Sequence, residues 1–249
     1  MELPQPTFLI ERSIDITTAP SLLSYFHLTQ SPSEVSQTNA VGIADFENAP
    51  RLPGVEKDLK NFKEVFGDAV GTIIQKNPIL EPDIARVFGE PGLLLIGTHG
   101  QNEADRPLAS FLLCNSGGDF DGRLTAMELF NLPIKSDVVV LSACYSGLAD
   151  RSPLPGDDLF GLQRAILQSG AKSVVSGLWD VYDDTAPELI KSTMTNFNGG
   201  QTISRSLAEA QREFLRKRKE AGTSDPWVHP YFWAVYTCSG GGHSKFASR

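Results

Sequence analysis

The sequence predicts an α/β protein whose core is a mostly parallel β-sheet of about six strands, with helices on both faces. Five short apolar runs rich in branched side chains are typical of buried strands, and stretches of helix length with one apolar face lie between most of them. Strands that alternate with helices indicate a parallel sheet with covering helices. The chain has 249 residues, of which 41% are hydrophobic, so we expect a single domain over residues 1–240.

The expected elements follow in order along the chain. We expect a strand at residues 8–14 and a polar connecting loop at 31–39. Buried strands are expected at residues 41–46, 72–74, 93–96, 138–141 and 173–177. Amphipathic helices are expected at 58–66 and 158–168, another helix ending near residue 196, and a long charged helix at 204–221. Residues 232–238 are expected to add a last strand, and residues 241–249, beside a run of three glycines, a flexible tail.

Charge and cysteine content exclude several function classes. The 22 Lys and Arg residues against 30 Asp and Glu give a net charge of −8 without a dense basic stripe, so we expect no direct nucleic-acid partner. Cys114, Cys144 and Cys238 are odd in number and lack a C-x-x-C pair, which favours neither disulfides nor zinc and fits a reducing cytoplasm. No apolar run approaches the ~18 residues of a membrane span, so we expect no membrane insertion.

Two of the buried strands end in residues with reactive side chains. The run LLLIGTHG ends on His99 and Gly100, and the run VVVLSACYSG passes through Cys144. Parallel neighbours in one sheet would bring His99 and Cys144 to the same carboxyl edge, where open α/β sheets bind ligands. A thiol is a good nucleophile, an imidazole manages its protons, and backbone N–H groups of Gly100 and Cys144 can stabilise an oxyanion. The pattern therefore predicts a Cys-His site for acyl transfer.

The two sequence segments at the strand ends also resemble the His-Gly and Ser-Ala-Cys-x-x-Gly boxes of the CHAT family, which is related to caspases, metacaspases and separase. The resemblance extends through FLIER, LPGVEKDLKNF, DGRLTAMEL, GLQRAILQSGAKSVVSGLWDVYDD, SLAEAQREFL and HPYFWAVYT, in that order along the chain. It implies a caspase-like (caspase–haemoglobinase) fold, with Cys144 as nucleophile, His99 as its partner, an oxyanion hole at Gly100 and Cys144, and no metal or organic cofactor. Two residues separate Cys144 from the next glycine, so the aspartate specificity of caspases is not implied.

The resemblance implies a cytoplasmic cysteine endopeptidase that cleaves specific protein substrates under the control of a sensor domain or partner. In bacteria, relatives of this type belong to antiviral defence or cell-death systems whose targets include gasdermin-like proteins, so an effector protein of that kind is an expected substrate. An alternative is a catalytically silent CHAT-like module that binds peptides. A third is a redox sensor that uses Cys144 as an oxidisable thiol.

Three further features leave alternatives open. Asp180, Asp183 and Asp184 follow the strand at 173–177 and form either an acidic pocket for a basic substrate residue or the start of a helix. The proline-containing residues 149–156 are expected to form a surface loop that reorders or is cleaved on activation. Residues 117–128 match a calcium loop only in part, and Thr125 with Glu128 predicts a capping box instead.

Overall fold

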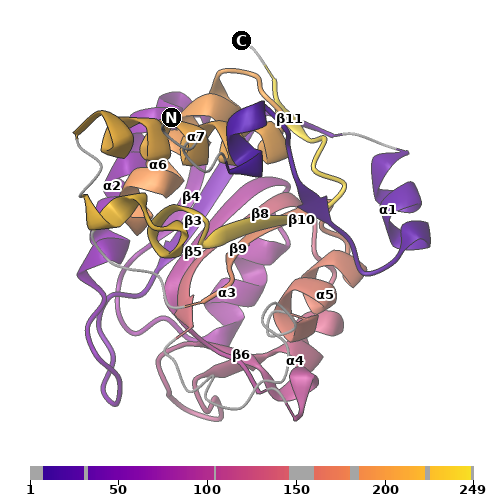
Figure 1. Ribbon diagram of the computed structural model, residues 1–249. Coiled ribbons are helices and arrows are strands. Elements are labelled where there is room, and N and C mark those ends of the chain that lie inside the picture. Colours follow the sequence, from indigo (N-terminus) through magenta and orange to yellow (C-terminus); the bar gives the residue numbers. More distant parts are fainter. Residues whose placement is uncertain are drawn as a thin grey trace, which may run out of the picture.

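The computed structural model describes residues 8–30, 33–103, 105–145, 160–179, 185–221 and 225–247 (Figure 1). Nine strands of this part of the chain form one sheet. Its main path runs in the order β1 (Thr17–Thr18), β10 (Tyr236–Gly240), β9 (Ser173–Gly177), β8 (Ser136–Tyr145), β5 (Gly92–Gln101), β3 (Thr38–Gly42) and β4 (Val70–Ile74). Neighbours on this path are parallel except β10 and β9, so the predicted mostly parallel sheet is confirmed.

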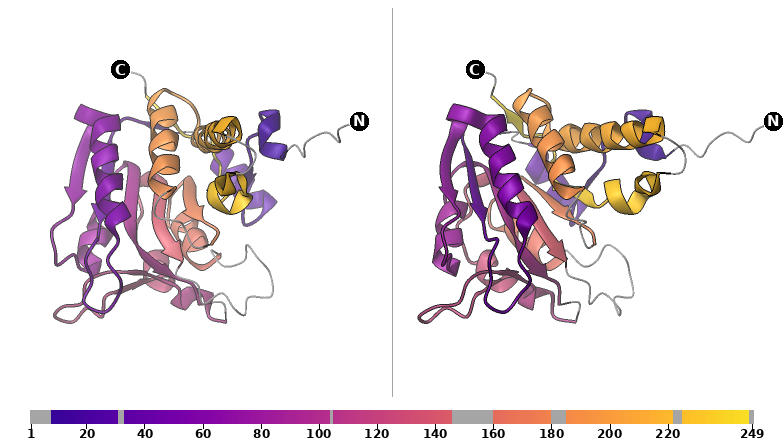
Figure 2. Two further views of the ribbon diagram at one scale, coloured as in Figure 1. Left: turned by 60° about the vertical axis from the view of Figure 1, so that its left-hand side comes forward. Right: turned by 90° about the vertical axis from the view of Figure 1, so that its left-hand side faces the viewer.

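Helices cover both faces of the sheet, as predicted. One face carries α2 (Pro53–Phe66), α6 (Ala186–Asn198) and α7 (Ile203–Ala221), and the other carries α3 (Glu81–Phe88), α4 (Ala126–Phe130) and α5 (Phe160–Gln168). Figure 2 shows α2 and α6 side by side on their face. The remaining helices are α1 (Leu22–Thr29), α8 (Pro230–Trp233) and the 3-10 turns η1 (Leu9–Arg12), η2 (Gly67–Ala69), η3 (Pro107–Ala109) and η4 (Pro226–Val228).

The sheet is buried on both sides because its strands alternate between two apolar cores. Along β5, Leu93 and Leu95 belong to the core under α2, α6 and α7, whereas Leu94 and Ile96 belong to the core under α3 and α5. All four side chains are completely buried. This two-sided burial explains why the central strands are continuous apolar runs in the sequence.

Two glycines allow α2 to lie close to the sheet. Gly42 on β3 and Gly97 on β5 are register partners. A Cβ atom at Gly42 would lie 2.6 Å from Leu59 Cδ1, and one at Gly97 would lie 3.1 Å from both γ carbons of Val55. A side chain at either position would therefore push the helix away from the strand ends that it covers.

Several expected boundaries need correction. The sheet has nine strands rather than about six, because β1 and the hairpin of β6 (Phe111–Leu113) and β7 (Arg123–Thr125) are too short to show an apolar pattern. Residues 8–14 contain the turn η1 instead of a strand, because the Glu11 carboxylate accepts the Phe8 N–H at 2.9 Å and closes a tight turn. The last strand begins only at Tyr236, because Pro230 starts a short helix before it.

The expected flexible tail is also wrong over residues 241–247. Lys245–Phe246 forms strand β11, which pairs with β2 (Glu34–Val35) inside the expected loop at 31–39. Phe246 is buried against Phe66 and Phe197, at ring-centroid distances of 5.4 and 5.9 Å. The burial of this aromatic ring holds the segment in place after the glycines. The expected surface loop at 149–156 lies outside the described residues.

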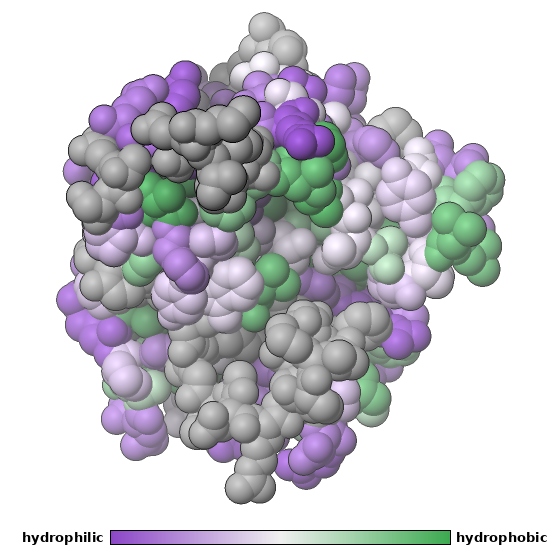
Figure 3. Space-filling view, in the orientation of Figure 1, coloured by the Kyte–Doolittle hydropathy of each residue, from purple (hydrophilic) through white to green (hydrophobic). Residues whose placement is uncertain are grey.

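The helix α1 lies at the margin of the fold, where the partly buried Leu28 packs against the core under α3 and α5. None of its side chains is buried, and Leu22, Leu23 and Phe26 are 84%, 66% and 57% exposed. The apolar surface at the right of Figure 3 lies over this helix. It is far along the sheet from the strand ends that carry the predicted site, beyond β10 (Figure 1).

Candidate active site

The structure brings His99 and Cys144 to the same position on neighbouring strands. His99 of β5 and Cys144 of β8 are register partners in a parallel pair, and Gly100 pairs with Tyr145 at the next step. Adjacent strands lie about 4.8 Å apart, and register partners share one face of a sheet. Two residues earlier, Gly97 and Ser142 are partners on the face covered by α2, and His99 lies two residues beyond Gly97 on the same strand.

The His99 ring is oriented by a main-chain carbonyl. Its Nε2 lies 2.7 Å from the carbonyl oxygen of Pro50, and its ring centroid lies 5.0 Å from that of Phe46. A carbonyl can only accept, so Nε2 carries a proton and donates it to Pro50. In the neutral ring, the lone pair is then on Nδ1. This arrangement leaves Nδ1 available to take or give a proton.

The segment that supplies Pro50 is residues 43–52, the loop from β3 to α2. Its base is closed by a hydrogen bond from the Leu52 N–H to the Ala44 oxygen at 2.9 Å. Arg51 forms ion pairs with Asp45 at 2.8 Å and Glu56 at 2.6 Å, and its hydrogen bond to Asp45 raises the pKa of the guanidinium. Side-chain amides hold the loop from outside, because Asn77 and Asn115 both donate to the Asp45 carbonyl.

A buried carboxylate on α2 lies beside β8, next to the residue two positions before Cys144. Asp58 of α2 is only 2% exposed, and its Oδ2 accepts a hydrogen bond of 2.6 Å from the Ser142 hydroxyl, two residues before Cys144. The cavity beside Asp58 and Ser142 has a volume of about 20 Å³, room for one water molecule. Sequence analysis missed Asp58, although a carboxylate on the same helix stripe as Val55 and Phe62 was a signal.

An aromatic pair lies on the other side of β8. The register of β8 with β9 pairs Leu141 with Ser176, and three more residues bring the chain to Trp179. The Trp179 ring stacks on Tyr231 at a centroid distance of 6.1 Å and an angle of 19°, and its Nε1–H donates to the Tyr231 carbonyl at 3.0 Å. Tyr231 is 41% exposed. The aromatic residues of 229–233 thus form a short helix beside the strand ends, in addition to packing near the last strand.

The other cysteines are not candidates for nucleophiles. Cys114 and Cys238 are buried, and burial raises the pKa of each thiol to about 12. At neutral pH both are fully protonated, which is the inert state of a core cysteine. Their expected role as core residues is confirmed.

The remaining sequence candidates divide into those that the structure describes and those that it does not. Asp180, Asp183 and Asp184 lie outside the described residues. The Thr125–Glu128 capping box is confirmed at the start of α4. Across the described ranges, no group of three His, Cys, Asp or Glu residues is placed to hold a metal ion, and no helix there has the length and apolar character needed to cross a membrane.

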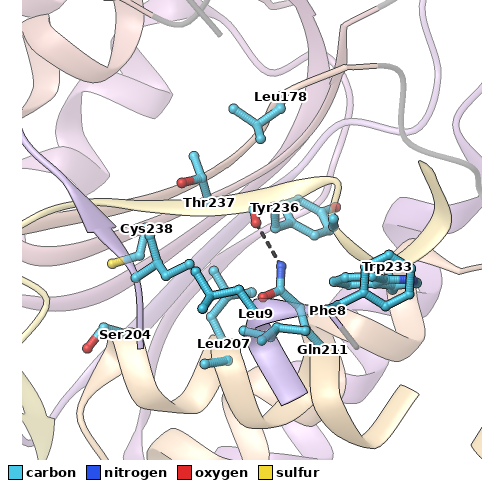
Figure 4. A pocket seen from close by; sticks show the side chains of 14 residues that line it. Phe8, Leu9, Leu178, Ser204, Leu207, Gln211, Trp233, Tyr236, Thr237 and Cys238 are labelled. Atoms are coloured by element: carbon cyan, nitrogen blue, oxygen red, sulfur yellow. Dashed lines mark hydrogen bonds between the residues drawn. The ribbon is translucent and has the colours of Figure 1, made fainter. Parts of the chain in front are cut away.

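A separate cavity lies away from the pair, on the outer side of β10. It has a volume of about 270 Å³ and is lined by apolar side chains of residues 8–16, α7 and α8, among them Phe8, Leu207 and Trp233 (Figure 4). The Gln211 amide in its wall is already hydrogen-bonded, because its Nε2 donates to the Tyr236 carbonyl at 2.9 Å. Nothing in its lining resembles the Cys-His arrangement.

Comparison with solved structures identifies the class of fold. The chain superimposes on separase in the Saccharomyces cerevisiae separase–securin complex with a TM-score of 0.58 and 15% identity, over 92% of this chain and 14% of that one. It superimposes on the Arg-specific cysteine proteinase gingipain R with a TM-score of 0.55 and 11% identity, over 91% of this chain and 53% of that one. The protein therefore has the caspase-like α/β fold that these cysteine peptidases share.

The family follows from the sequence. The model of the CHAT domain family matches residues 2–241, so the chain belongs to the CHAT domain family, and the resemblance is confirmed. A curated relative, the mouse (Mus musculus) tetratricopeptide repeat protein 28, is 30% identical over 117 residues. That match covers 47% of this chain and 4% of the relative, so the chain spans only a small part of that protein's length.

Proposed function

We propose that this protein is a cysteine endopeptidase of the CHAT type, with Cys144 as nucleophile and His99 as general acid and base. The observation that carries the proposal is the register of His99 with Cys144 on neighbouring strands, together with an imidazole whose Nε2 is fixed on Pro50. Strand ends over a rigid sheet hold reacting groups more accurately than loops do. The fold shared with separase and gingipain R supports the same chemistry.

In the proposed mechanism Nδ1 of His99 takes the proton of the Cys144 thiol, and the sulfur attacks the carbonyl carbon of a peptide bond, so that a C–S bond forms as the C=O double bond opens. The negative charge on the former carbonyl oxygen is stabilised by the N–H groups of Gly100 and Cys144. His99 gives a proton from Nδ1 to the departing amine as the C–N bond breaks. Water then attacks the thioester, His99 takes its proton, and the thiol is released with the acid product. The Pro50 carbonyl stabilises the imidazolium that forms in between.

The preferred residue before the scissile bond is proposed to be basic. Asp180, Asp183 and Asp184 follow β9 and supply the acidic groups of this proposal. The arginine specificity stated for gingipain R, which shares this fold, is consistent with such a pocket.

Control by a protein partner is part of the proposal. The separase neighbour is bound to securin, and the mouse relative is a tetratricopeptide repeat protein. We propose that a sensor domain or partner restrains this peptidase in the cytoplasm, where its thiol stays reduced, and that the substrate is an effector protein such as a gasdermin-like protein in a bacterial defence or cell-death system.

A peptide-library digest tests the activity. The wild-type protein is compared with Cys144→Ala and His99→Ala, and Cys114→Ala is the matched control because it also removes a thiol. We expect the wild type and the control to cleave the same peptides, and both site variants to lose at least ~10³-fold in kcat/KM. Equal cleavage by Cys144→Ala would refute the mechanism. Peptide binding without cleavage by the wild type would favour the silent binding module.

A further inference from the structure

The Trp179–Tyr231 pair has a defined position relative to the reactive residues. In the sheet, β8 lies between β5, which carries His99, and β9, which leads into Trp179. The paired register of β8 with β9 ends at Leu141 and Ser176, and Cys144 and Trp179 each follow that last pair by three residues. The Leu178 N–H donates to the Val235 carbonyl at 2.7 Å, so the ladder with the β10 segment continues past the end of β9. His99 and the aromatic pair therefore flank Cys144 on opposite sides.

The surface around Tyr231 is apolar. The Tyr231 ring lies edge-on to Phe232 at 5.3 Å, and an open hollow of about 760 Å³ beside both rings is walled by further apolar side chains, Phe8, Pro226, Val228 and Pro230. The Asp225 and His229 side chains on its wall are used in local hydrogen bonds. Asp225 accepts the Trp227 N–H at 2.9 Å, and His229 Nδ1 accepts the Tyr231 N–H at 3.2 Å. The hollow thus presents ring faces and aliphatic surface to whatever enters it.

The proposed chemistry fixes the direction of the substrate across these strands. His99 protonates the departing amine, so the half of the peptide that leaves first lies toward β5. The half that stays on Cys144 as the acyl group must then extend the other way, over β8 toward β9 and the aromatic pair. The strand β9 lies about 4.8 Å beyond β8, a distance that an extended chain crosses in one to two residues, so the aromatic pair is within reach of residues two or three before the scissile bond.

From this placement we propose that Tyr231, supported by Trp179, forms a subsite for a large apolar side chain two or three residues before the scissile bond. The inference rests on the proposed peptidase function, and it adds an apolar requirement to the substrate class. A stacked, half-exposed ring offers area for such a side chain at little conformational cost, because its own position is fixed by the Trp179 contact.

The test uses two eight-residue peptides from the digest that are identical except for Phe or Gly at the third position before the cleaved bond. We expect the wild type to prefer Phe by about ten-fold or more in kcat/KM. Tyr231→Ala should remove this preference, so that the two peptides are cleaved with similar kcat/KM, and Tyr231→Phe should restore it. Phe130→Ala is the matched control, because Phe130 is also exposed, at 47%, but lies on α4 across the sheet.

A binding measurement separates failure of this inference from failure of the peptidase proposal. The labelled peptide pair is titrated by fluorescence anisotropy into Cys144→Ala protein, with and without Tyr231→Ala. Tighter binding of the Phe peptide that depends on Tyr231 supports the subsite even where Cys144→Ala proves not to abolish cleavage of the pair. Equal binding of both peptides, or an equal loss for both on Tyr231→Ala, overturns it.

Discussion

The close approach of α2 to the sheet at Gly97 gives a prediction whose size follows from the structure. An added Cβ at this position would lie 3.1 Å from both γ carbons of Val55, which is itself buried. Ordinary contacts between carbon atoms are about 3.5–4.0 Å, so Gly97→Ala forces α2 away by several tenths of an ångström, and we expect a cost of about 1–3 kcal/mol in the free energy of unfolding. Val55→Ala removes two buried methyl groups and should cost about 2 kcal/mol.

The double variant tests whether the cost of Gly97→Ala comes from the contact between the added Cβ and Val55. Removing the Val55 methyl groups opens the space that the Cβ added by Gly97→Ala needs, so we expect Gly97→Ala with Val55→Ala to be at least ~1 kcal/mol more stable than the sum of the two single changes predicts. Urea unfolding of the four proteins gives these free energies. Gly117→Ala is the matched control and should change stability by less than ~0.5 kcal/mol, because its Cβ would lie 3.3 Å from the end of the Leu80 side chain, which is only partly buried and can move aside. Strict additivity of the two changes would refute the packing argument.

Three further predictions concern charge and helix capping. Burial raises the pKa of the Glu81 carboxyl in the folded protein, so the free energy of unfolding of the wild type should fall as pH rises through that pKa. Glu81→Gln should abolish this pH dependence, measured by urea unfolding at several pH values, and an unchanged dependence would contradict the prediction. The hydrogen bond from Lys219 lowers the pKa of Glu11 in the folded protein, so the stabilisation by this ion pair is present above the pKa that Glu11 has in the unfolded chain and is lost as pH falls through the folded-state pKa. Lys219→Met should therefore lower the free energy of unfolding by about 0.5 kcal/mol at neutral pH and leave it unchanged in acid. Thr125→Ala should cost ~1 kcal/mol in thermal unfolding through loss of the α4 cap, while Thr125→Ser should cost little.

The sequence predicted the interior of the sheet better than the strand ends. The strand at 173–177 matches β9 completely, because both faces of it are buried and the apolar run ends where the pairing ends. The runs at 93–96 and 138–141 are shorter than β5 and β8, which continue to Gln101 and Tyr145. Main-chain pairing holds these extensions, and it does not require apolar side chains. His99 and Cys144 are therefore inside strands rather than just after them.

The parts of the site that sequence reasoning missed depend on contacts between distant residues. The acceptor for His99 is a main-chain carbonyl, which every residue has, so no residue type at position 50 indicates it. The Asp58–Ser142 hydrogen bond joins residues 84 positions apart and became visible only when α2 and β8 were placed together. The expected strand at 8–14 failed for a local reason, because one carboxylate closed the turn η1.

The dependence of His99 on Pro50 has a consequence for how this protein tolerates mutation. Amino-acid substitution replaces side chains and leaves the carbonyl at position 50 in place, so the group that orients the imidazole survives any exchange of that residue. What substitution can alter is the path of the loop, through the Arg51 ion pairs, the amides of Asn77 and Asn115, or the Phe46 ring. The orientation of the His99 ring would then be lost through changes at neighbouring positions rather than at position 50 itself.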